Sequence, residues 1–334
     1  MKQFINAKED MVTEAIDGTI AASGGALTRL DGYPHIRVVV RADWDKLKVA
    51  LVTGGGSGHE PAHAGFIGKG MLTAAVCGDV FASPSADAVL AGILAVTGPA
   101  GCLLIVKNYT GDRLNFGLAA ERARAFGHKV NMVIVDDDIA LPDLPQARGL
   151  AGTLFVHKIA GAMAENGADL GACTLTAERV IKASRSIGMS LDTCTVPGSP
   201  KENRIPHGMA ELGLGIHGEA GIEQVASNGA ADAISKVIDR LAAKMPEGPH
   251  AVLINNLGAA SVLEMSILTK NLLSSQIIDQ IKFIVGPAAL MTALDMHGFS
   301  VSVMALSSGD DILLSQITEA PSWPGCKAVV ATPF

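Results

Sequence analysis

The chain has 334 residues, of which 49% are hydrophobic and only 4% are aromatic, and its formal net charge is −7. This length favours two domains over one core, and the absence of any basic run argues against a nucleic-acid-binding surface. The five cysteines form no C-x-x-C pair and fit a reducing compartment. No segment approaches the ~20 apolar residues of a membrane span. The N-terminus has no apolar signal core, so a cytoplasmic protein is expected.

The first half of the chain alternates short apolar runs with helical patterns. Residues 14–26 look partly helical, and 36–40 form a β-branched run. Strands are expected at 49–53, 72–76, 102–106 and 130–135, and helices at 85–96 and 114–126. Such alternation predicts a mainly parallel or mixed sheet that is covered by helices.

The second half repeats this rhythm after an irregular stretch. Residues 150–188 look helical, whereas 195–214 lose periodicity and gather Pro and Gly. Further strands are expected at 251–255, 283–285 and 299–305, and further helices at 222–244, 262–273 and 288–297. We therefore predict two α/β domains, an N-terminal one at 1–190 with a Gly-rich loop and a C-terminal one at 191–334. The Pro-bearing tail from residue 321 resembles the beginning of a linker.

The densest motif is Thr53-Gly-Gly-Gly-Ser-Gly-His-Glu-Pro61, which follows a predicted strand. Consecutive glycines leave backbone N–H groups open to a ligand, at the edge where open parallel sheets bind their ligands. A P-loop is excluded, because Gly58 is followed by His59 and Glu60 instead of Lys and Ser or Thr. The alternative to a binding loop is a tight turn without a ligand.

Three short clusters, one of histidines, one of aspartates and one of asparagines, suggest metal or ligand sites, and each also has a simpler interpretation. His59-Glu-Pro-Ala-His63 resembles a zinc motif, but Pro61 favours the first turn of a helix and leaves His59 outside it. Zinc is therefore disfavoured. Asp136-Asp-Asp138 could hold a divalent ion, but a solvated turn is the simpler interpretation. Asn255-Asn-Leu-Gly258 either lines a cleft or makes a turn.

A second glycine-rich motif, Gly213-Leu-Gly-Ile-His-Gly218, formally matches the dinucleotide fingerprint G-x-G-x-x-G. That fingerprint follows a strand and opens a helix, whereas the preceding His207-Gly-Met-Ala-Glu211 does not have the pattern of a buried strand. A dinucleotide-dependent oxidoreductase is thus only weakly suggested. In such a turn His217 presents its ring to a cavity, where a neutral imidazole is a nucleophile. The alternative is a hydrogen-bonded loop residue.

Two charged residues, Lys107 and Asp112, follow the strand predicted at 102–106. Lys107 is expected to emerge at the same sheet edge as the glycine loop, because the carboxyl ends of parallel strands meet there. Asp112 opens the helical pattern of 114–126. A helix N-cap for Asp112 and a surface charge for Lys107 are the simpler interpretations, and capping and catalysis are compatible.

Together these motifs resemble the substrate-binding module of the dihydroxyacetone kinases. The resemblance rests on the two glycine-rich motifs, on Phe81-Ala-Ser-Pro84 and on Val106-Lys-Asn-Tyr-Thr-Gly-Asp-Arg-Leu-Asn115. It also includes Leu253-Ile-Asn-Asn-Leu-Gly258 and Gly286-Pro-Ala288, and it runs in order from near residue 1 to about residue 320. The residues within these motifs are more similar to those of the ATP-using branch of the family than to those of its other members.

The resemblance implies two α/β domains, a dimer and a site between the domains. It implies that His217 forms a covalent hemiaminal with the ketone carbon of dihydroxyacetone, and that His59 and Asp112 act as general acid and base. It further implies that the glycine loop (Gly56, with Ser57 and Gly58) and Lys107 bind the substrate. No cofactor or metal is expected on this chain. ATP and Mg²⁺ are expected on a partner domain or subunit, unless a phospho-transfer relay supplies the phosphate.

The sequence departs from the family pattern at two places. Ala220 stands where Pro commonly follows His-Gly-Glu, and this change leaves the histidine intact. The chain also ends at Phe334 without a nucleotide site of the family's kind, so we expect a separate subunit or an excised domain. Phosphorylation of dihydroxyacetone, or of a relative such as erythrulose, is the leading hypothesis. The rival is a ketose-binding regulator without turnover.

Overall fold

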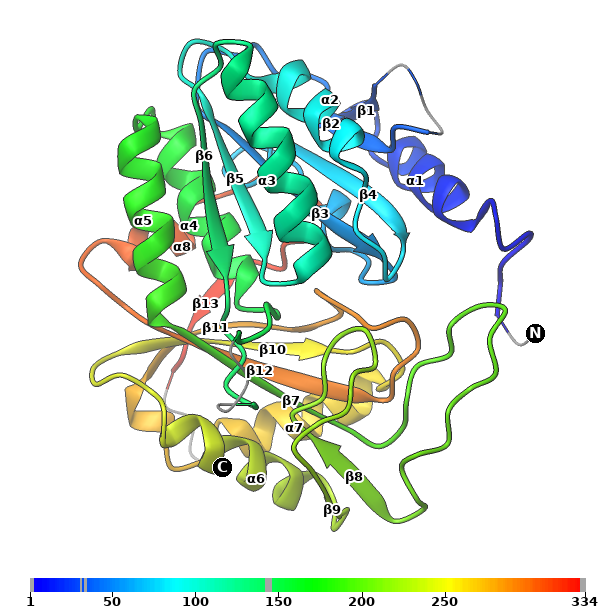
Figure 1. Ribbon diagram of the computed structural model, residues 1–334. Coiled ribbons are helices and arrows are strands. Elements are labelled where there is room, and N and C mark those ends of the chain that lie inside the picture. Colours follow the sequence, from blue (N-terminus) through cyan, green and yellow to red (C-terminus); the bar gives the residue numbers. More distant parts are fainter. Residues whose placement is uncertain (1–2, 31, 33–34, 142–145, 331–334) are drawn as a thin grey trace.

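The computed structural model of the chain, which describes residues 3–30, 32, 35–141 and 146–330, contains two β-sheets with helices packed against both (Figure 1). The first sheet consists of β1 (Leu27–Arg29), β2 (Val38–Arg41), β3 (Ala50–Ser57), β4 (Ala74–Val80), β5 (Cys102–Lys107) and β6 (Val130–Val135). Their order across the sheet is β1-β2-β4-β3-β5-β6. The last four in this order are parallel, and β1 and β2 add an antiparallel side. The predicted α/β class is confirmed.

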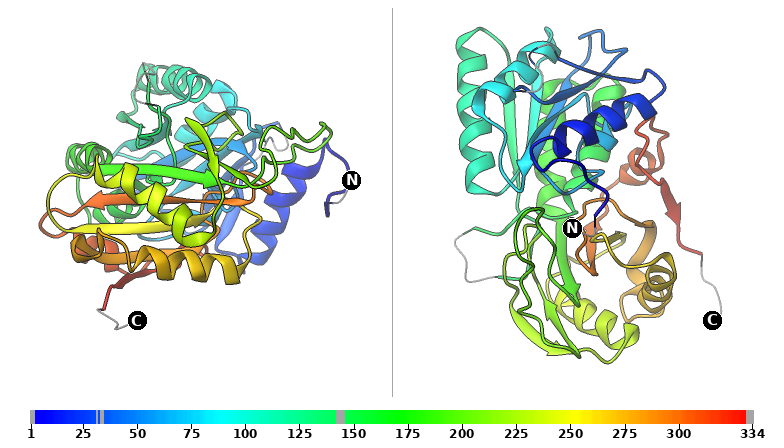
Figure 2. Two further views of the ribbon diagram at one scale, coloured as in Figure 1. Left: turned by 90° about the horizontal axis from the view of Figure 1, so that it is seen from below. Right: turned by 90° about the vertical axis from the view of Figure 1, so that its right-hand side faces the viewer.

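The second sheet is formed by β7 (Ser184–Ser190), β8 (Met209–Leu212), β9 (Glu223–Ala226), β10 (His250–Asn256), β11 (Ile281–Ala288), β12 (Gly298–Ala305) and β13 (Cys326–Ala328). Their order is β13-β11-β10-β12-β7-β8-β9. The pair β10 and β11 is parallel, and the other neighbouring strands are antiparallel. The two sheets lie one above the other in the side view of Figure 2.

Three of the helices begin just after a residue whose side chain caps them. The helices are α1 (Met11–Ala22), α2 (Ala86–Val96), α3 (Thr110–Ala125), α4 (Thr153–Glu165), α5 (Leu170–Ala183), α6 (Ala230–Ala242), α7 (Val262–Leu272) and α8 (Asp310–Ser315), with 3₁₀ turns η1 (Ala64–Phe66) and η2 (Ile278–Gln280). Ser85 caps α2, Asp169 caps α5, and Ser261 forms a capping box with Glu264 at α7. These side chains satisfy N–H groups that a helix terminus leaves without partners.

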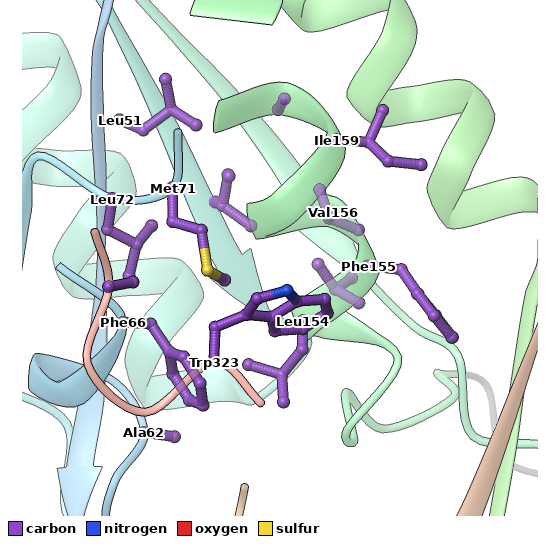
Figure 3. Close-up of a cluster of buried hydrophobic side chains, with 14 of the residues drawn as sticks. Leu51, Ala62, Phe66, Met71, Leu72, Leu154, Phe155, Val156, Ile159 and Trp323 are labelled. Carbon is purple, nitrogen blue, oxygen red and sulfur yellow. The ribbon is translucent and has the colours of Figure 1, made fainter. Parts of the chain in front are cut away.

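One hydrophobic core joins the two sheets. It contains Leu51 and Ile105 of the first sheet, Phe155 of α4, and Leu253 and Val285 of the second sheet. Figure 3 shows part of it, where Trp323 from near the C-terminus packs among side chains of the N-terminal half. The linker-like character that we predicted for the tail is therefore wrong for this part, since Trp323 is buried and β13 pairs with β11.

Three predicted helices need correction. The stretch 150–188 contains α4 and α5 but ends in strand β7, and 222–244 begins with strand β9 before α6. The helix predicted at 288–297 is wrong, because β11 ends at Ala288 and a loop follows it to β12. Since β7 lies in the second sheet, the chain enters that sheet six residues before the domain limit predicted at 190. The limits 1–190 and 191–334 stay a prediction.

Truncation of Phe155 tests the shared core. Its side chain is fully buried, so Phe155→Ala is expected to lower the free energy of unfolding by about 3–5 kcal/mol through lost burial and a cavity. Phe126→Ala is the matched control, because Phe126 is 65% exposed at the end of α3 and its loss should change stability by less than about 0.5 kcal/mol. Equal effects in urea denaturation would contradict a core that joins the two sheets.

Within the described residues, no helix is both long enough and apolar enough to cross a bilayer.

Candidate functional site

The carboxyl ends of β3, β4 and β5 bring the predicted loop residues to one edge of the first sheet. Two glycines allow close approaches there. A Cβ on Gly55, whose φ is +149°, would lie 2.9 Å from Nζ of Lys107 and 3.5 Å from Oδ2 of Asp112. A Cβ on Gly56 would lie 2.6 Å from the backbone N of Ala82. A side chain at either position would therefore displace the charged groups or the neighbouring segment.

His59 is fully buried behind this loop. Its Nδ1 lies 2.8 Å from the carbonyl oxygen of Thr292. A carbonyl only accepts, so Nδ1 carries the proton and donates it to this bond. Its Nε2 has no partner. Burial lowers the pKa of His59 well below its ordinary value, and the nearby charges of His217 and Lys107 lower it further. The ring is thus a neutral imidazole with an unoccupied lone pair, as a general base requires.

Lys107 and Asp112 are both buried, which corrects the simpler interpretations of each. Lys107, the last residue of β5, is 1% exposed and so is not a surface charge. Its ammonium donates to Nε2 of His63 at 2.7 Å and to the carbonyl of Gly54 at 3.4 Å. Asp112 lies in the first turn of α3, whose N-cap is Tyr109, so it is not the cap. Its Oδ1 is buried without a hydrogen-bond partner.

His217 lies in the turn that follows β8. Its backbone N–H donates to Oε2 of Glu219 at 3.0 Å, and its Nδ1 is 3.0 Å from Oε1 of the same carboxylate. Burial alone would raise the pKa of Glu219, but hydrogen bonds and charge interaction with His217 lower it to about 2. The ionised carboxylate can only accept. The proton of a neutral ring therefore sits on Nδ1, and the Nε2 lone pair is free to attack.

Three aromatic rings surround His217. Ring centroids of Tyr109, His59 and Phe81 lie 4.4, 4.8 and 5.3 Å from that of His217. His59 also stacks on Phe81 at 5.2 Å. The structure thus brings His59 of the first half against His217 of the second, at the edge where Lys107 and Asp112 border Gly55. Tyr109 and Phe81 were part of the motifs, but no sequence pattern predicted that their rings would lie at His217.

Several predicted or suspected positions have other tasks. The hydroxyl of Ser57 donates to the carbonyl of Gly78 at 2.8 Å, which leaves a contact of Ser57 with substrate as a prediction.

The solvated turn that we predicted at 136–138 is wrong for two of its three residues, because both are buried. Asp137 accepts from the N–H groups of Leu150 and Gly152, and Asp138 pairs with Arg148 at 2.6 Å. Burial raises the pKa of Asp137 to about 6. No group of metal-ligating side chains occurs among the described residues.

Two further expectations are resolved by the loops of the second sheet. A strand, β8, does precede Gly213, contrary to our reading of 207–211, but the next element is strand β9 and not a helix. The dinucleotide fingerprint therefore lacks its helix. Of the two alternatives for 255–258, the turn is confirmed at Asn256, whose side-chain oxygen accepts from the N–H of Gly258 at 2.8 Å. The side chain of Asn255 instead accepts from the N–H groups of Leu290 and Met291 and donates to the carbonyl of Met291. It thereby fixes the loop that carries Thr292.

A two-sheet α/β module that brings two histidines, a buried lysine and a buried aspartate together at one sheet edge defines a candidate enzyme site. The chain belongs to the Dak1 domain family, whose model it matches over residues 17–322. It is 53% identical over 324 residues to a dihydroxyacetone kinase of Citrobacter freundii, covering 96% of this chain and 59% of that relative. The native crystal structure of the C. freundii kinase matches with a TM-score of 0.96 at 50% identity, over 100% of this chain and 63% of that one.

Two further relatives are of similar length to this chain. The dihydroxyacetone-binding subunit DhaK of a PTS-dependent dihydroxyacetone kinase from Listeria innocua is 41% identical over 317 residues, 92% of this chain and 94% of the subunit. The structure of the dihydroxyacetone kinase operon co-activator Dha-DhaQ matches with a TM-score of 0.87 at 28% identity, over 93% and 97% of the two chains. The chain thus spans about three fifths of the C. freundii kinase and nearly all of the Listeria subunit.

Proposed function

We propose that this chain binds dihydroxyacetone, or a similar short ketose, as a covalent hemiaminal on His217 and presents a hydroxyl group of the ketose for phosphorylation. The observation that carries the proposal is the pairing of His217 Nδ1 with Glu219 at 3.0 Å, which leaves Nε2 free beside the unpartnered Nε2 of His59. A triose offers little apolar surface, so a covalent bond supplies the hold that non-covalent contacts alone lack.

In the capture step, the lone pair of His217 Nε2 attacks the ketone carbon, and the π bond of the carbonyl breaks. Nδ1 releases its proton to Glu219, from which it passes to the carbonyl oxygen, so that in net terms the ring N–H adds across the carbonyl. The reaction requires a carbonyl and therefore selects ketoses over polyols such as glycerol. Lys107 and the backbone of Gly56 hold the hydroxyl groups of the bound molecule.

In the transfer step, the free hydroxyl oxygen attacks the phosphorus of the donor, and the bond between that phosphorus and its leaving group breaks. The hydroxyl proton passes to Asp112 or to His59 Nε2, each of which has an unpartnered buried atom. The phosphate donor, ATP with Mg²⁺, is bound by a partner domain or subunit. A partner is supported by the Listeria relative of this length, which is named as the dihydroxyacetone-binding subunit of a PTS-dependent kinase, and by the greater length of the C. freundii dihydroxyacetone kinase. A homodimer in the cytoplasm belongs to the same proposal.

The proposal is tested by adding dihydroxyacetone labelled with ¹³C at its carbonyl carbon to the chain and recording ¹³C NMR spectra. The expected result is a protein-bound resonance of a tetrahedral carbon, and in a crystal soaked with the ketose, continuous density from His217 Nε2 to that carbon. Glycerol should give neither signal. A bound molecule that keeps its ketone resonance would contradict covalent capture.

A second candidate function is a ketose-binding regulator without turnover. It is favoured by the match to the operon co-activator Dha-DhaQ over nearly the whole of both chains. Both functions need His217, but only phosphorylation needs a base at His59 or Asp112. Formation of dihydroxyacetone phosphate when the chain is combined with an ATP-binding partner domain decides for the kinase.

A further inference from the structure

The buried ammonium of Lys107 has neutral hydrogen-bond acceptors. Its donor bonds reach Nε2 of His63 at 2.7 Å and the carbonyl oxygen of Gly54 at 3.4 Å, and no carboxylate within the described part of the chain forms a salt bridge with it. His63 is itself buried, at the residue that precedes η1. Neither the motifs of the sequence nor the proposed catalytic steps give His63 a role.

We infer that His63 is a positioning residue for Lys107: it holds the ammonium at the glycine loop through a neutral acceptor, so that the positive charge stays available for the oxygen atoms of the bound ketose. This inference rests on the proposed function. Two of the three N–H groups of Lys107 are taken up by His63 and Gly54. The ammonium also lies 2.9 Å from the point where a Cβ of Gly55 would be, and the absence of that Cβ leaves room for a ligand atom beside it.

A neutral acceptor suits this task better than a carboxylate would. A carboxylate at the position of His63 would hold the ammonium equally well, but it would neutralise the charge that polarises a substrate oxygen. His63 accepts from Lys107 only while it is uncharged. Burial lowers the pKa of His63 well below its ordinary value, and the charge of Lys107 lowers it further. His63 therefore remains an acceptor throughout the pH range in which the enzyme would work.

Titratable groups from several elements interact electrostatically with Lys107. Burial lowers the pKa of Lys107, while the charges of Asp112 and Asp137 raise it. The histidines that experience its charge lie after β3, before η1 and in α4: they are His59, His63 and His157. The ring of His157 lies 5.2 Å from that of His63, and neither of its nitrogens has a hydrogen-bond partner. His63 is thus the histidine that bonds Lys107 directly.

The first test measures the pKa of Lys107 itself, in the ligand-free chain, by NMR of ¹³C-labelled lysine side chains. His63→Leu removes the acceptor at similar volume and leaves the ammonium with one distant carbonyl. Loss of a hydrogen bond to the charged form disfavours that form, so the pKa of Lys107 should fall by about one unit or more. His63→Gln, which restores an acceptor oxygen, should recover most of the shift. An unchanged pKa in His63→Leu would overturn the inference.

The second test measures ketose binding against pH in the same variants. Because the ammonium is lost at lower pH in His63→Leu, the alkaline limb of ketose binding should move to lower pH, with a loss of up to about tenfold for each unit by which the pKa of Lys107 falls. The matched control is His250→Leu, which also removes a buried histidine with an unpartnered Nε2 but lies in the second sheet, at the start of β10. Equal losses in both variants would indicate a merely structural role for His63.

The two proposals fail separately. If the wild-type chain forms no covalent adduct, the proposed function is wrong, whereas the Lys107 titration still reports on His63. If the adduct forms and the pKa of Lys107 does not depend on His63, only this inference is wrong.

Discussion

Replacement of His217 by Ala is expected to abolish the tetrahedral ¹³C resonance of bound dihydroxyacetone. It is also expected to lower kcat/KM for phosphorylation by at least about a thousandfold, as loss of a nucleophile does. The reason is that Nε2 of His217 forms the covalent bond in the proposed mechanism, and no other histidine among the described site residues combines a free nitrogen with a carboxylate partner such as Glu219. The phosphorylation assay requires the chain together with its ATP-binding partner.

The control for this experiment is His207→Ala, which removes an exposed histidine just before β8 in the same half of the chain. It should leave both capture and turnover unchanged within about twofold, as surface substitutions do. Glu219→Gln is expected to have an intermediate effect. The ring of His217 loses its ionised acceptor, so capture of the ketose should be slower but not absent. Full activity of the His217→Ala enzyme would rule out the hemiaminal mechanism.

The sequence was sufficient to place the residues that follow parallel strands. The glycine loop, His59 and Lys107 come after β3 and β5, and the carboxyl ends of such strands meet at one edge of a sheet. The buried state of Asp112 and Lys107 was not predictable in the same way. It depends on segments far along the chain, which close over the edge, and periodicity carries no information about them.

The helix wrongly predicted at 288–297 shows why long-range contacts were missed. Leu290, Met291, Ala293 and Met296 are all buried, and their spacing imitates the apolar stripe of a helix. The amide of Asn255 satisfies backbone groups of this segment and holds it as a loop. That loop places the carbonyl of Thr292 against His59 Nδ1, so the tautomer of the base is set by a residue 233 positions away.

The turn at 213–219 was recognised from its glycines and its histidine, and the function of Glu219 follows from its position. It lies two positions after His217, which suffices for one carboxylate to accept from both the backbone N–H and the ring of that histidine. Arg148 anchors the same turn by donating to the carbonyl of Gly213 at 2.7 Å while it pairs with Asp138. The acidic run at 136–138 thus supports the nucleophile from a distance, and the sequence offered no sign of that link.

Replacement of Asp112 by Asn is expected to separate the two chemical steps. Ketose capture should remain, because His217 and Glu219 are unchanged, whereas kcat for phosphorylation should fall by about 10²- to 10⁴-fold through loss of a general base. The carboxylate is well placed for this role, since its Oδ1 is buried without a partner and its Oδ2 borders Gly55 beside Lys107. Asp136→Asn is the control, because Asp136 is exposed at the end of β6.

His59 is the competing base, and the variants His59→Asn and Asp112→Asn together distinguish it from Asp112. A base works only while unprotonated, and the pKa of His59 is lowered well below 6.5 by burial and by the charges of His217 and Lys107. Turnover that depends on His59 should therefore stay level as the pH falls through 6.5 and decline only at lower pH. His59→Asn keeps a donor for the carbonyl of Thr292 and removes the free Nε2. If His59→Asn loses turnover while Asp112→Asn retains it, His59 is the base and Asp112 is not.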